Sequence, residues 1–280
     1  MSIKHLAIVQ ARMSSTRFPG KVLANLGGKP MIEYQLNRIH SSQLVESVVI
    51  ATSDSPTDDP LVDFLESLGE IVVRGDLNDV FSRFELVVNK FKPENFVRIT
   101  GDCPLVMPNL IDDMIKAFSE TPVDYFSNAI NQSFPDGLDL EIISSKAFGT
   151  AAKMKLDSVE REHVTLAMYG RTGSFKTANY FSGMDLSHHR WTVDYPEDLL
   201  FINAIVREEQ SAGKLFEVQD ILDFLEKNPQ IQNTISSNLR NIAIKKYLGE
   251  DFNVQIFKFR KPFDRGREFH PARFSNVQQI

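Results

Sequence analysis

The sequence lacks features that mark several classes of protein. Cysteine occurs once, at Cys103, which excludes an internal disulfide and a multi-cysteine zinc site, and it predicts a reducing, cytoplasmic location. The net charge is −6 and no long run of Lys or Arg occurs, which disfavours a nucleic-acid partner. No segment has the roughly 18 apolar residues that span a bilayer, and the apolar run in MSIKHLAIVQ is shorter than a signal-peptide core. We therefore expect neither nucleic acid nor a membrane as a partner.

Apolar runs of strand length alternate with stretches of helical period. The chain has 280 residues, 42% hydrophobic and 24% charged, which suits one large domain. The first half predicts strands at 5–10, 47–52, 70–74 and 95–100, and helices at 30–40, 60–68 and 78–91. This alternation predicts an α/β fold, with a mostly parallel central sheet flanked by helices in a Rossmann-like arrangement.

The second half is less regular. It predicts helices at 108–118, 196–210, 217–227 and 234–247, and strands at 123–127, 138–143, 174–181 and 189–194. A further helix is expected to begin near residue 157, because Asp157 and Glu160 have the spacing of a capping box. Residues 1–249 are expected to form the main domain. Residues 250–280 alternate aromatic and basic side chains. We expect them to pack as an extension on this domain or a neighbouring subunit, with a substrate-facing arm as the alternative.

The stretch AIVQARMSSTRFPGKVL, residues 7–23, follows the first predicted strand with three cations, Arg12, Arg17 and Lys21. It is neither a Walker A loop nor a G-x-G-x-x-G motif. Ligands of an open parallel sheet bind where strands end. Arginine grips two phosphate oxygens at once and lysine adds a mobile charge, so this loop suits a triphosphate. The alternative is a surface loop with solvated charges.

Two aspartates end other predicted strands. Asp102 follows the fourth strand in RITGDCPL, and Asp194 ends a strand in WTVDYPEDLLF. Carboxylates at neighbouring strand ends suit a hard cation such as Mg²⁺. A turn or helix-capping role is the simpler interpretation of Asp102, but capping does not readily account for Asp194.

Further polar residues have both structural and functional interpretations. In FPDGLDLEI, Asp136 lies in a turn, and Asp139 and Glu141 alternate with apolar residues, which places both carboxylates on one face of a predicted strand. Many half-exposed strands show this pattern. The functional alternative is that the two carboxylates bind a polyhydroxylated substrate. His163 in EREHVT is either a structural helix residue or a substrate contact. His188 and His189 would point to opposite faces of a strand and are interpreted as structural. In RGDLNDVFSRF, Asp76 or Asp79 is a candidate helix cap, and Arg74 and Arg83 are left for ion pairs or a nucleotide.

VQARMSSTRFPGKVL resembles the signature of the sugar cytidylyltransferases, which include the acylneuraminate and 3-deoxy-manno-octulosonate enzymes. TGDCP, DGLDLE, EREHVT and TVDYPEDL resemble the SpsF-like branch, named for spore-coat polysaccharide biosynthesis. The resemblance covers about residues 3–235. It implies a nucleotide-diphosphosugar transferase fold of the GT-A type, and transfer of CMP from CTP to a sugar with release of pyrophosphate. It also implies Mg²⁺ as cofactor, an ulosonic acid as the sugar, and a possible homodimer.

The residue patterns and the resemblance together assign roles to individual residues. The predicted catalytic residues are Arg12, Lys21 and Asp102, and the predicted metal ligands are Asp102 and Asp194. The predicted substrate contacts are Asp136, Asp139, Glu141 and His163. The predicted nucleotide contacts are Gln10, Ala11, Arg12, Ser15, Arg17, Lys21, Arg74, Asp79 and Thr100. The octulosonate enzymes typically have glutamine where this chain has Thr100, so their nucleobase recognition does not transfer to it.

Three other functions are weighed against this one. A glycosyltransferase that uses a nucleotide-sugar donor usually carries Asp-x-Asp, where this chain reads Asp102-Cys103-Pro104. A sugar-1-phosphate nucleotidyltransferase usually opens with a glycine-rich loop, which is absent here. A non-catalytic nucleotide-binding protein of the same fold remains the third alternative.

Overall fold

The first strand shows how the chain builds a two-sided sheet. In β1, His5–Gln10, residues Ala7 and Val9 pack into one hydrophobic core while Leu6 and Ile8 pack into a second. Successive side chains of a strand point to opposite faces of the sheet, so a strand that is apolar at every position is buried on both faces.

The computed structural model describes residues 3–171, 173–232 and, by backbone, 257–260.

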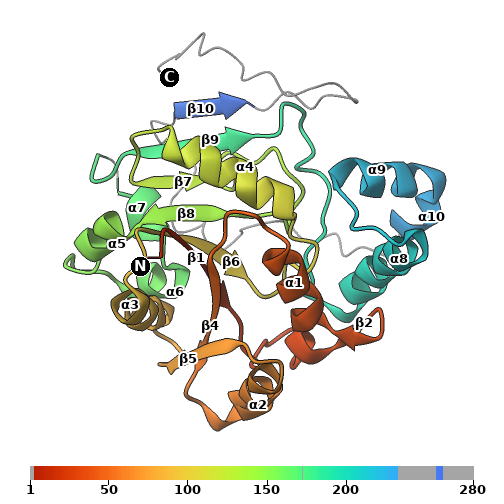
Figure 1. The fold of residues 1–280 in the computed structure, drawn as a ribbon, viewed down its shortest axis with the longest axis horizontal. Helices are drawn as coiled ribbons and strands as arrows, with labels where there is room; N and C mark the ends of the chain where they lie inside the picture. Colours follow the sequence, from red (N-terminus) through yellow and green to blue (C-terminus); the bar gives the residue numbers. More distant parts are fainter. Residues whose placement is uncertain (1–2, 172, 233–256, 261–280) are drawn as a thin grey trace.

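Eight strands form the main sheet, in the order β10-β9-β7-β8-β6-β1-β4-β5 (Figure 1). Strand β8 is antiparallel to both of its neighbours, and the other pairings are parallel. The other strands are β4 Ser47–Ser53, β5 Ile71–Gly75, β6 Asn95–Thr100, β7 Tyr125–Ser127, β8 Glu141–Ser144, β9 Thr177–Phe181 and β10 Phe257–Arg260; β2 Asn25–Leu26 and β3 Lys29–Pro30 form a separate small sheet.

Helices cover both faces of the sheet. The helices are α1 Met31–His40, α2 Asp59–Ser67, α3 Val80–Phe91, α4 Pro108–Ser119, α5 Ser145–Ala151, α6 Ser158–His163, α7 Leu166–Tyr169, α8 Pro196–Ala212, α9 Val218–Lys227 and α10 Pro229–Gln232, with short 3₁₀ turns at η1 Lys21–Leu23 and η2 Pro56–Asp58. The larger core contains residues of α1, α2, α4, α8 and α9, and the second contains residues of α3, α5 and α7. None of the helices in this part of the chain is long and apolar enough to cross a membrane.

The order of the strands places the site. The chain runs from β1 to β4 and β5 on one side, then crosses to β6 on the other side of β1. Connections that leave β1 and β6 therefore diverge, which opens a crevice at the carboxyl ends of these strands. The predicted mostly parallel α/β sheet is confirmed, and the candidate site lies at this crevice.

Local capping decides where helices begin. The sequence predicts a helix from residue 78, but α3 begins at Val80 because the side chain of Asp79 accepts a hydrogen bond from the Ser82 amide. The predicted capping box is confirmed: Asp157 accepts from the Glu160 amide and Glu160 accepts from the Asp157 amide. Helices α5 and α7 were not predicted.

Two predicted strands need correction. The strand expected over 138–143 begins only at Glu141, because the Asn128 side chain donates to the Leu138 carbonyl and accepts from the Leu140 amide. The strand expected over 189–194 is wrong: this segment makes one isolated bridge, between Asp136 and Arg190. The helix expected over 234–247 and the boundary at residue 249 lie outside the described residues. That domain division stays a prediction.

Candidate active site

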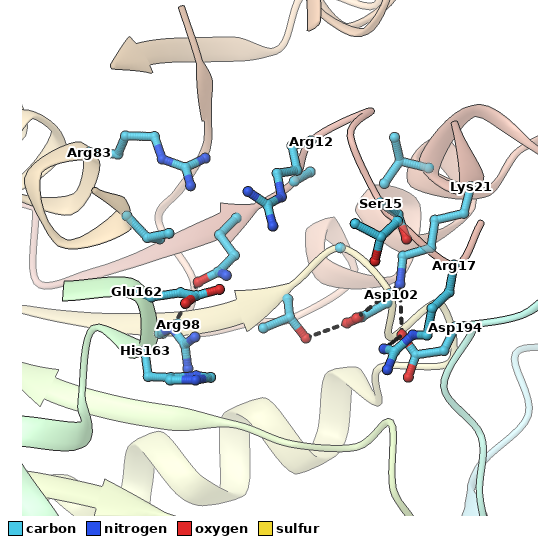
Figure 2. A pocket seen from close by; sticks show the side chains of 17 residues that line it. Arg12, Ser15, Arg17, Lys21, Arg83, Arg98, Asp102, Glu162, His163 and Asp194 are labelled. Carbon is cyan, nitrogen blue, oxygen red and sulfur yellow. Dashed lines mark hydrogen bonds and ion pairs between the residues drawn. The ribbon is translucent and has the colours of Figure 1, made fainter. Parts of the chain in front are cut away.

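A cavity of about 260 Å³ opens at the carboxyl ends of β1 and β6. Its lining includes ten residues predicted from the sequence: Gln10, Ala11, Arg12, Ser15, Arg17, Lys21, Thr100, Asp102, His163 and Asp194. Figure 2 labels seven of them, which come from the loop after β1, the turn after β6, the segment before α8 and the end of α6: Arg12, Ser15, Arg17, Lys21, Asp102, Asp194 and His163. The fold thus gathers both signs of charge at one end of the sheet.

Lys21 lies at the centre of the charged group. Its Nζ is 3.2 Å from Asp102 Oδ2 and 3.0 Å from Asp194 Oδ1, and it donates to the Val193 carbonyl at 2.7 Å. Gly20, with φ of 74°, makes the left-handed turn that leads into η1. Only 10% of the Lys21 side chain is exposed, so these contacts replace most of its hydration.

The two carboxylates remain charged because of this lysine. Burial opposes the charge of Asp194, but Lys21, Arg190 and Arg17 outweigh burial and lower its pKa to about 2. Burial likewise opposes ionisation of Asp102, and Lys21 and Thr100 lower its pKa overall. The carboxylates in turn raise the pKa of Lys21 against the effect of its burial. The cluster is therefore fully ionised near neutral pH.

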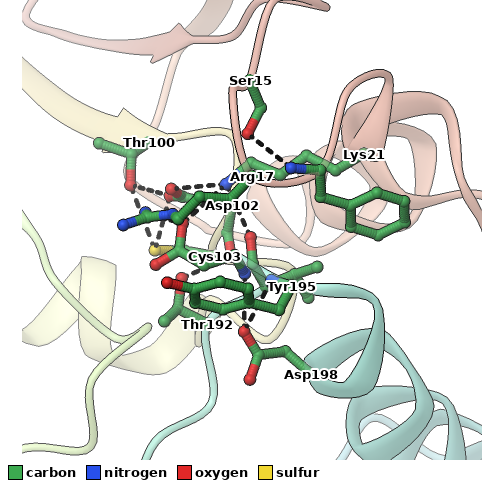
Figure 3. A network of polar contacts seen from close by, with 12 residues as sticks. Ser15, Arg17, Lys21, Thr100, Asp102, Cys103, Thr192, Tyr195 and Asp198 are labelled. Carbon is green, nitrogen blue, oxygen red and sulfur yellow. Dashed lines mark hydrogen bonds and ion pairs between the residues drawn. The ribbon is translucent and has the colours of Figure 1, made fainter. Parts of the chain in front are cut away.

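Asp194 is held from several sides. Its Oδ1 accepts from Lys21 and lies 2.7 Å from Arg17 Nη2, while its Oδ2 accepts from Arg190 at 3.0 Å. The buried carboxylate of Asp198 fixes the backbone beside it by accepting from the amides of Asp194 and Tyr195 at 2.9 and 3.0 Å (Figure 3). Asp194 is therefore held in place by Asp198 at the start of α8 as well as by the three cations.

The lowered pKa of Asp194 predicts an acid-sensitive contribution to stability. Its folded pKa is about 2 against an ordinary 3.8, so the contribution is present above about pH 4 and is lost as pH falls towards 2. We expect Asp194→Asn to show a smaller fall in the free energy of unfolding across that window than wild type. Urea denaturation at pH 5 and pH 2.5 measures both falls. Equal falls in the two proteins would contradict the assignment.

The opposite end of the cavity is built around Arg98 of β6. Its Nε donates to Gln10 Oε1 at 3.0 Å, and its Nη1 forms a short ion pair with Glu141. Glu141 Oε1 also accepts from Tyr125 at 2.6 Å and from Thr165 at 2.5 Å. Burial opposes the charge of Arg98, but Glu141 outweighs it and raises the Arg98 pKa. Glu141 therefore fixes a cation that borders the cavity.

A strained turn places His163 beside Arg98. Val164, a buried β-branched residue, has φ of 55° and ψ of −60°, a backbone conformation that costs roughly 1–3 kcal/mol. The turn is held by the core packing of Val164 and by the bond from Thr165 to Glu141. Both residues before Val164, Glu162 and His163, line the cavity. Burial, the largest effect, and Arg98 lower the His163 pKa against the opposing effects of Glu162 and Glu141, which favours a neutral imidazole.

Arg74 and Asp79, two predicted nucleotide contacts, do not line the cavity. Arg74 donates to the Ser53 and Ser55 carbonyls, each at 3.0 Å, and pairs with Asp59 at 2.7 Å. Asp79 caps α3 and pairs with Arg161. Both side chains hold loops together behind the cavity wall.

The three acidic residues of FPDGLDLEI are also outside the lining. Asp136 pairs with Arg190 at 2.9 Å and Glu141 pairs with Arg98. Asp139 precedes β8, so the predicted placement of Asp139 and Glu141 on one strand face is wrong. A side chain at Gly137 would meet the Trp191 carbonyl at 2.6 Å. The absence of a side chain there lets this turn pack against the segment that carries Asp194.

The histidine pair also differs from expectation. His188 and His189 were expected to point to opposite faces of a strand, but that strand is absent and their ring centroids are 4.1 Å apart. Sequence reasoning missed Arg98 and Arg190. A charged residue two positions before Thr100 in a buried strand was the available signal for Arg98.

The comparisons with known proteins agree with this geometry. Residues 6–279 match the family model described as cytidylyltransferase. The chain is 32% identical over 234 residues to the spore coat polysaccharide biosynthesis protein SpsF of Bacillus subtilis, covering 80% of this chain and 95% of that protein. It is 37% identical over 119 residues to the 3-deoxy-manno-octulosonate cytidylyltransferase of Geobacter sulfurreducens, covering 41% of this chain and 46% of that enzyme.

A solved structure shows the same fold over most of the chain. The cytidylyltransferase of Leptospira borgpetersenii superposes with a TM-score of 0.78 at 28% identity, covering 85% of this chain and 100% of that one. The matched family model spans nearly the whole sequence, including the basic loop and both aspartates. The chain therefore belongs to the cytidylyltransferase family, and its chemistry is nucleotidyl transfer.

Proposed function

We propose that this enzyme transfers CMP from CTP to a hydroxyl group of an ulosonic acid and releases pyrophosphate, in the biosynthesis of a cell-surface or spore-coat polysaccharide. The observation that carries the proposal is the buried Lys21 ammonium between Asp102 and Asp194, beside Arg12 and Arg17 in one cavity. The similarity to SpsF and to an octulosonate cytidylyltransferase supports the acceptor class.

The basic loop is proposed to hold the triphosphate. Arg12, Ser15, Arg17 and Lys21 all line the cavity, and together they offer two guanidinium forks, a hydroxyl and an ammonium to phosphate oxygens. Gln10, Ala11 and Thr100 form the wall between this loop and β6. Arg74 and Asp79 have structural contacts instead and are left out of the proposed nucleotide site.

Asp102 and Asp194 are proposed to hold Mg²⁺. Their oxygens converge on one cation, Lys21 Nζ, at 3.2 and 3.0 Å. Within residues 3–171 and 173–232 no group of three His, Cys, Asp or Glu suits a metal, and Mg²⁺ is commonly bound by one or two carboxylates with phosphates and water. The donors therefore fit this ion, which when bound neutralises phosphate charge and orients the reacting oxygens.

The protein's part in the reaction follows from the placement of charge. The acceptor oxygen forms a bond to the α-phosphorus and loses its proton to water, while the bond from that phosphorus to the pyrophosphate oxygen breaks and its electron pair leaves with pyrophosphate. Lys21, Arg12 and Arg17 stabilise negative charge that accumulates on the departing pyrophosphate and the equatorial oxygens. Lys21 already donates to Asp102, Asp194 and the Val193 carbonyl, so its ammonium exchanges at least one of these contacts for a phosphate oxygen when the nucleotide binds.

The end of the cavity with Arg98 and His163 is proposed to receive the acceptor. An ulosonic acid carries a carboxylate and several hydroxyl groups, which suit a guanidinium and a neutral imidazole as partners. Glu141 contributes by fixing Arg98, and Asp136 by pairing with Arg190, which also binds Asp194. These two carboxylates therefore act as positioning residues in the proposal.

A panel assay tests the function. The enzyme is incubated with CTP, Mg²⁺ and each of several nonulosonic and octulosonic acids, and pyrophosphate release is followed. We expect release with at least one acid, and its loss in Asp102→Asn without loss of folding. Asp223→Asn, a change at an exposed residue of α9, is the matched control and should retain full activity.

Two outcomes would overturn this proposal. No release with any acid, under conditions where an octulosonate cytidylyltransferase is active, would remove the acceptor assignment. Tight CTP binding without turnover would favour a nucleotide-binding protein instead. A homodimer and a cytoplasmic location also belong to this proposal, and sedimentation analysis tests the dimer.

A further inference from the structure

Arg83 is a buried cation that the proposed chemistry leaves unused. It projects from α3, lines the cavity and is only 2% exposed. Among residues 3–171 and 173–232, its one hydrogen bond is a long contact of 3.4 Å from Nη1 to the Ala51 carbonyl, and its buried Nε has no acceptor. No carboxylate of the described residues lies within ion-pair distance. A buried group with unfilled donors costs free energy unless a ligand satisfies it.

The position of Arg83 separates it from the other cations. Ala51, whose carbonyl accepts the hydrogen bond from Arg83, belongs to β4, whereas Arg98 and Glu141 lie on β6 and β8, on the other side of β1. Gly75 leaves room for its stem, since a side chain there would meet Arg83 Cγ at 3.0 Å. Figure 2 shows the guanidinium directed towards Arg12 across the cavity. A ligand group on the β4 side would meet it.

Charges of both signs surround Arg83. Burial and the nearby Arg12 lower the Arg83 pKa, while Asp58, Asp76 and Asp79 act against them. Each of these carboxylates is bonded elsewhere: Asp58 to the Met13 amide, Asp76 to the Asn78 amide and Asp79 to the Ser82 amide. They offset the charge of Arg83 but fill none of its donors. The acceptor atoms of a ligand can therefore fill the free donors of Arg83.

We propose that Arg83 is the residue that reads the nucleobase of the nucleotide, by donating to O2 and N3 of cytosine. The assignment rests on the proposed use of CTP. Cytosine presents these two neutral acceptors side by side, which matches two N–H groups of a guanidinium. Uracil carries hydrogen on N3, so one donor of Arg83 would face another. Val80, a buried residue of the same helix that also lines the cavity, supplies apolar surface for a flat ring.

Calorimetry with CTP, UTP and inorganic tripolyphosphate tests this assignment. We expect wild type to prefer CTP over UTP, and Arg83→Lys, which keeps the charge but loses the fork, to bind CTP about tenfold or more weakly. Its affinity for tripolyphosphate should be unchanged, and its affinity for UTP should not fall. Arg38→Lys is the control for altering a buried arginine, since Arg38 lies outside the cavity lining, and thermal unfolding of each variant shows that it folds.

The other outcomes separate this inference from the proposed function. Equal weakening of all three ligands would assign Arg83 to phosphate, and no weakening of any would make it structural; either result overturns base reading while wild-type CTP binding stands. Equal affinity of wild type for CTP and UTP also overturns it. Absence of CTP binding by wild type would overturn the proposed function and this assignment together.

Discussion

Replacing Lys21 with methionine is expected to lower the rate of nucleotidyl transfer by about 10²- to 10³-fold, the usual effect of losing one preorganised group that stabilises charge in the transition state. The ammonium contacts both strand-end carboxylates, Asp194 at 3.0 Å and Asp102 at 3.2 Å. Methionine fills similar volume, so packing is retained while the charge is lost. Pyrophosphate release with CTP and an accepted sugar measures the change.

The matched control for this variant is Lys29→Met. Lys29 follows Lys21 closely in the chain, but it is exposed and pairs with Glu33. We expect its rate to stay within twofold of wild type. A Lys21→Met enzyme within tenfold of the wild-type rate would show that the ammonium mainly holds Asp102 and Asp194 in place and does not stabilise the transferring group.

The largest effect on stability is expected from Glu209→Ala, at about 3–5 kcal/mol of unfolding free energy. Glu209 of α8 is buried and pairs with the fully buried Arg38 of α1 at 2.5 Å. It also accepts from Tyr34 and from the Phe216 amide. Removal of the carboxylate leaves the Arg38 charge without a counter-ion inside the core. Urea denaturation followed by circular dichroism measures the loss.

Two further variants separate charge from packing. Glu208→Ala changes an exposed neighbour on the same helix and should alter stability by less than about 0.5 kcal/mol. The double variant Arg38→Met with Glu209→Leu removes both charges and should recover much of the loss. A double variant as unstable as Glu209→Ala would show that lost packing, and not the unpaired charge, is the cause.

The regular part of the fold was predictable because it follows local periodicity. The strands at 5–10 and 95–100 match the structure, and the one at 47–52 falls one residue short of β4, since a strand buried on both faces needs an apolar run. In the segment 189–194, Trp191 and Val193 alternate with polar residues. Its backbone bonds to two separate loops, from the Trp191 amide to the Asp136 carbonyl and from the Val193 amide to the Asp102 carbonyl. Such pairings join residues far apart in the chain, and no local pattern encodes them.

The candidate site also has a part that the sequence predicts and a part that only the fold reveals. Arg12, Lys21 and Asp102 follow strands that the sequence predicts, so their meeting at one sheet end follows from parallel topology. Arg190 was missed because its role depends on three carboxylates that only the fold brings to it, Asp136, Asp194 and Asp198. Glu141 was expected at a substrate, but its partners Arg98, Tyr125 and Thr165 come from three other elements or turns.

The contacts of Lys21 have a consequence for the making of the protein. They join it to Asp102, 81 residues later, and to Asp194, 173 residues later. During synthesis the basic loop and the first carboxylate leave the ribosome well before the second. No nascent chain that ends before residue 194 can assemble this charged cluster, however well its early strands have paired. Competence for transfer is thus withheld from incomplete chains until α8 and the segment before it have been made.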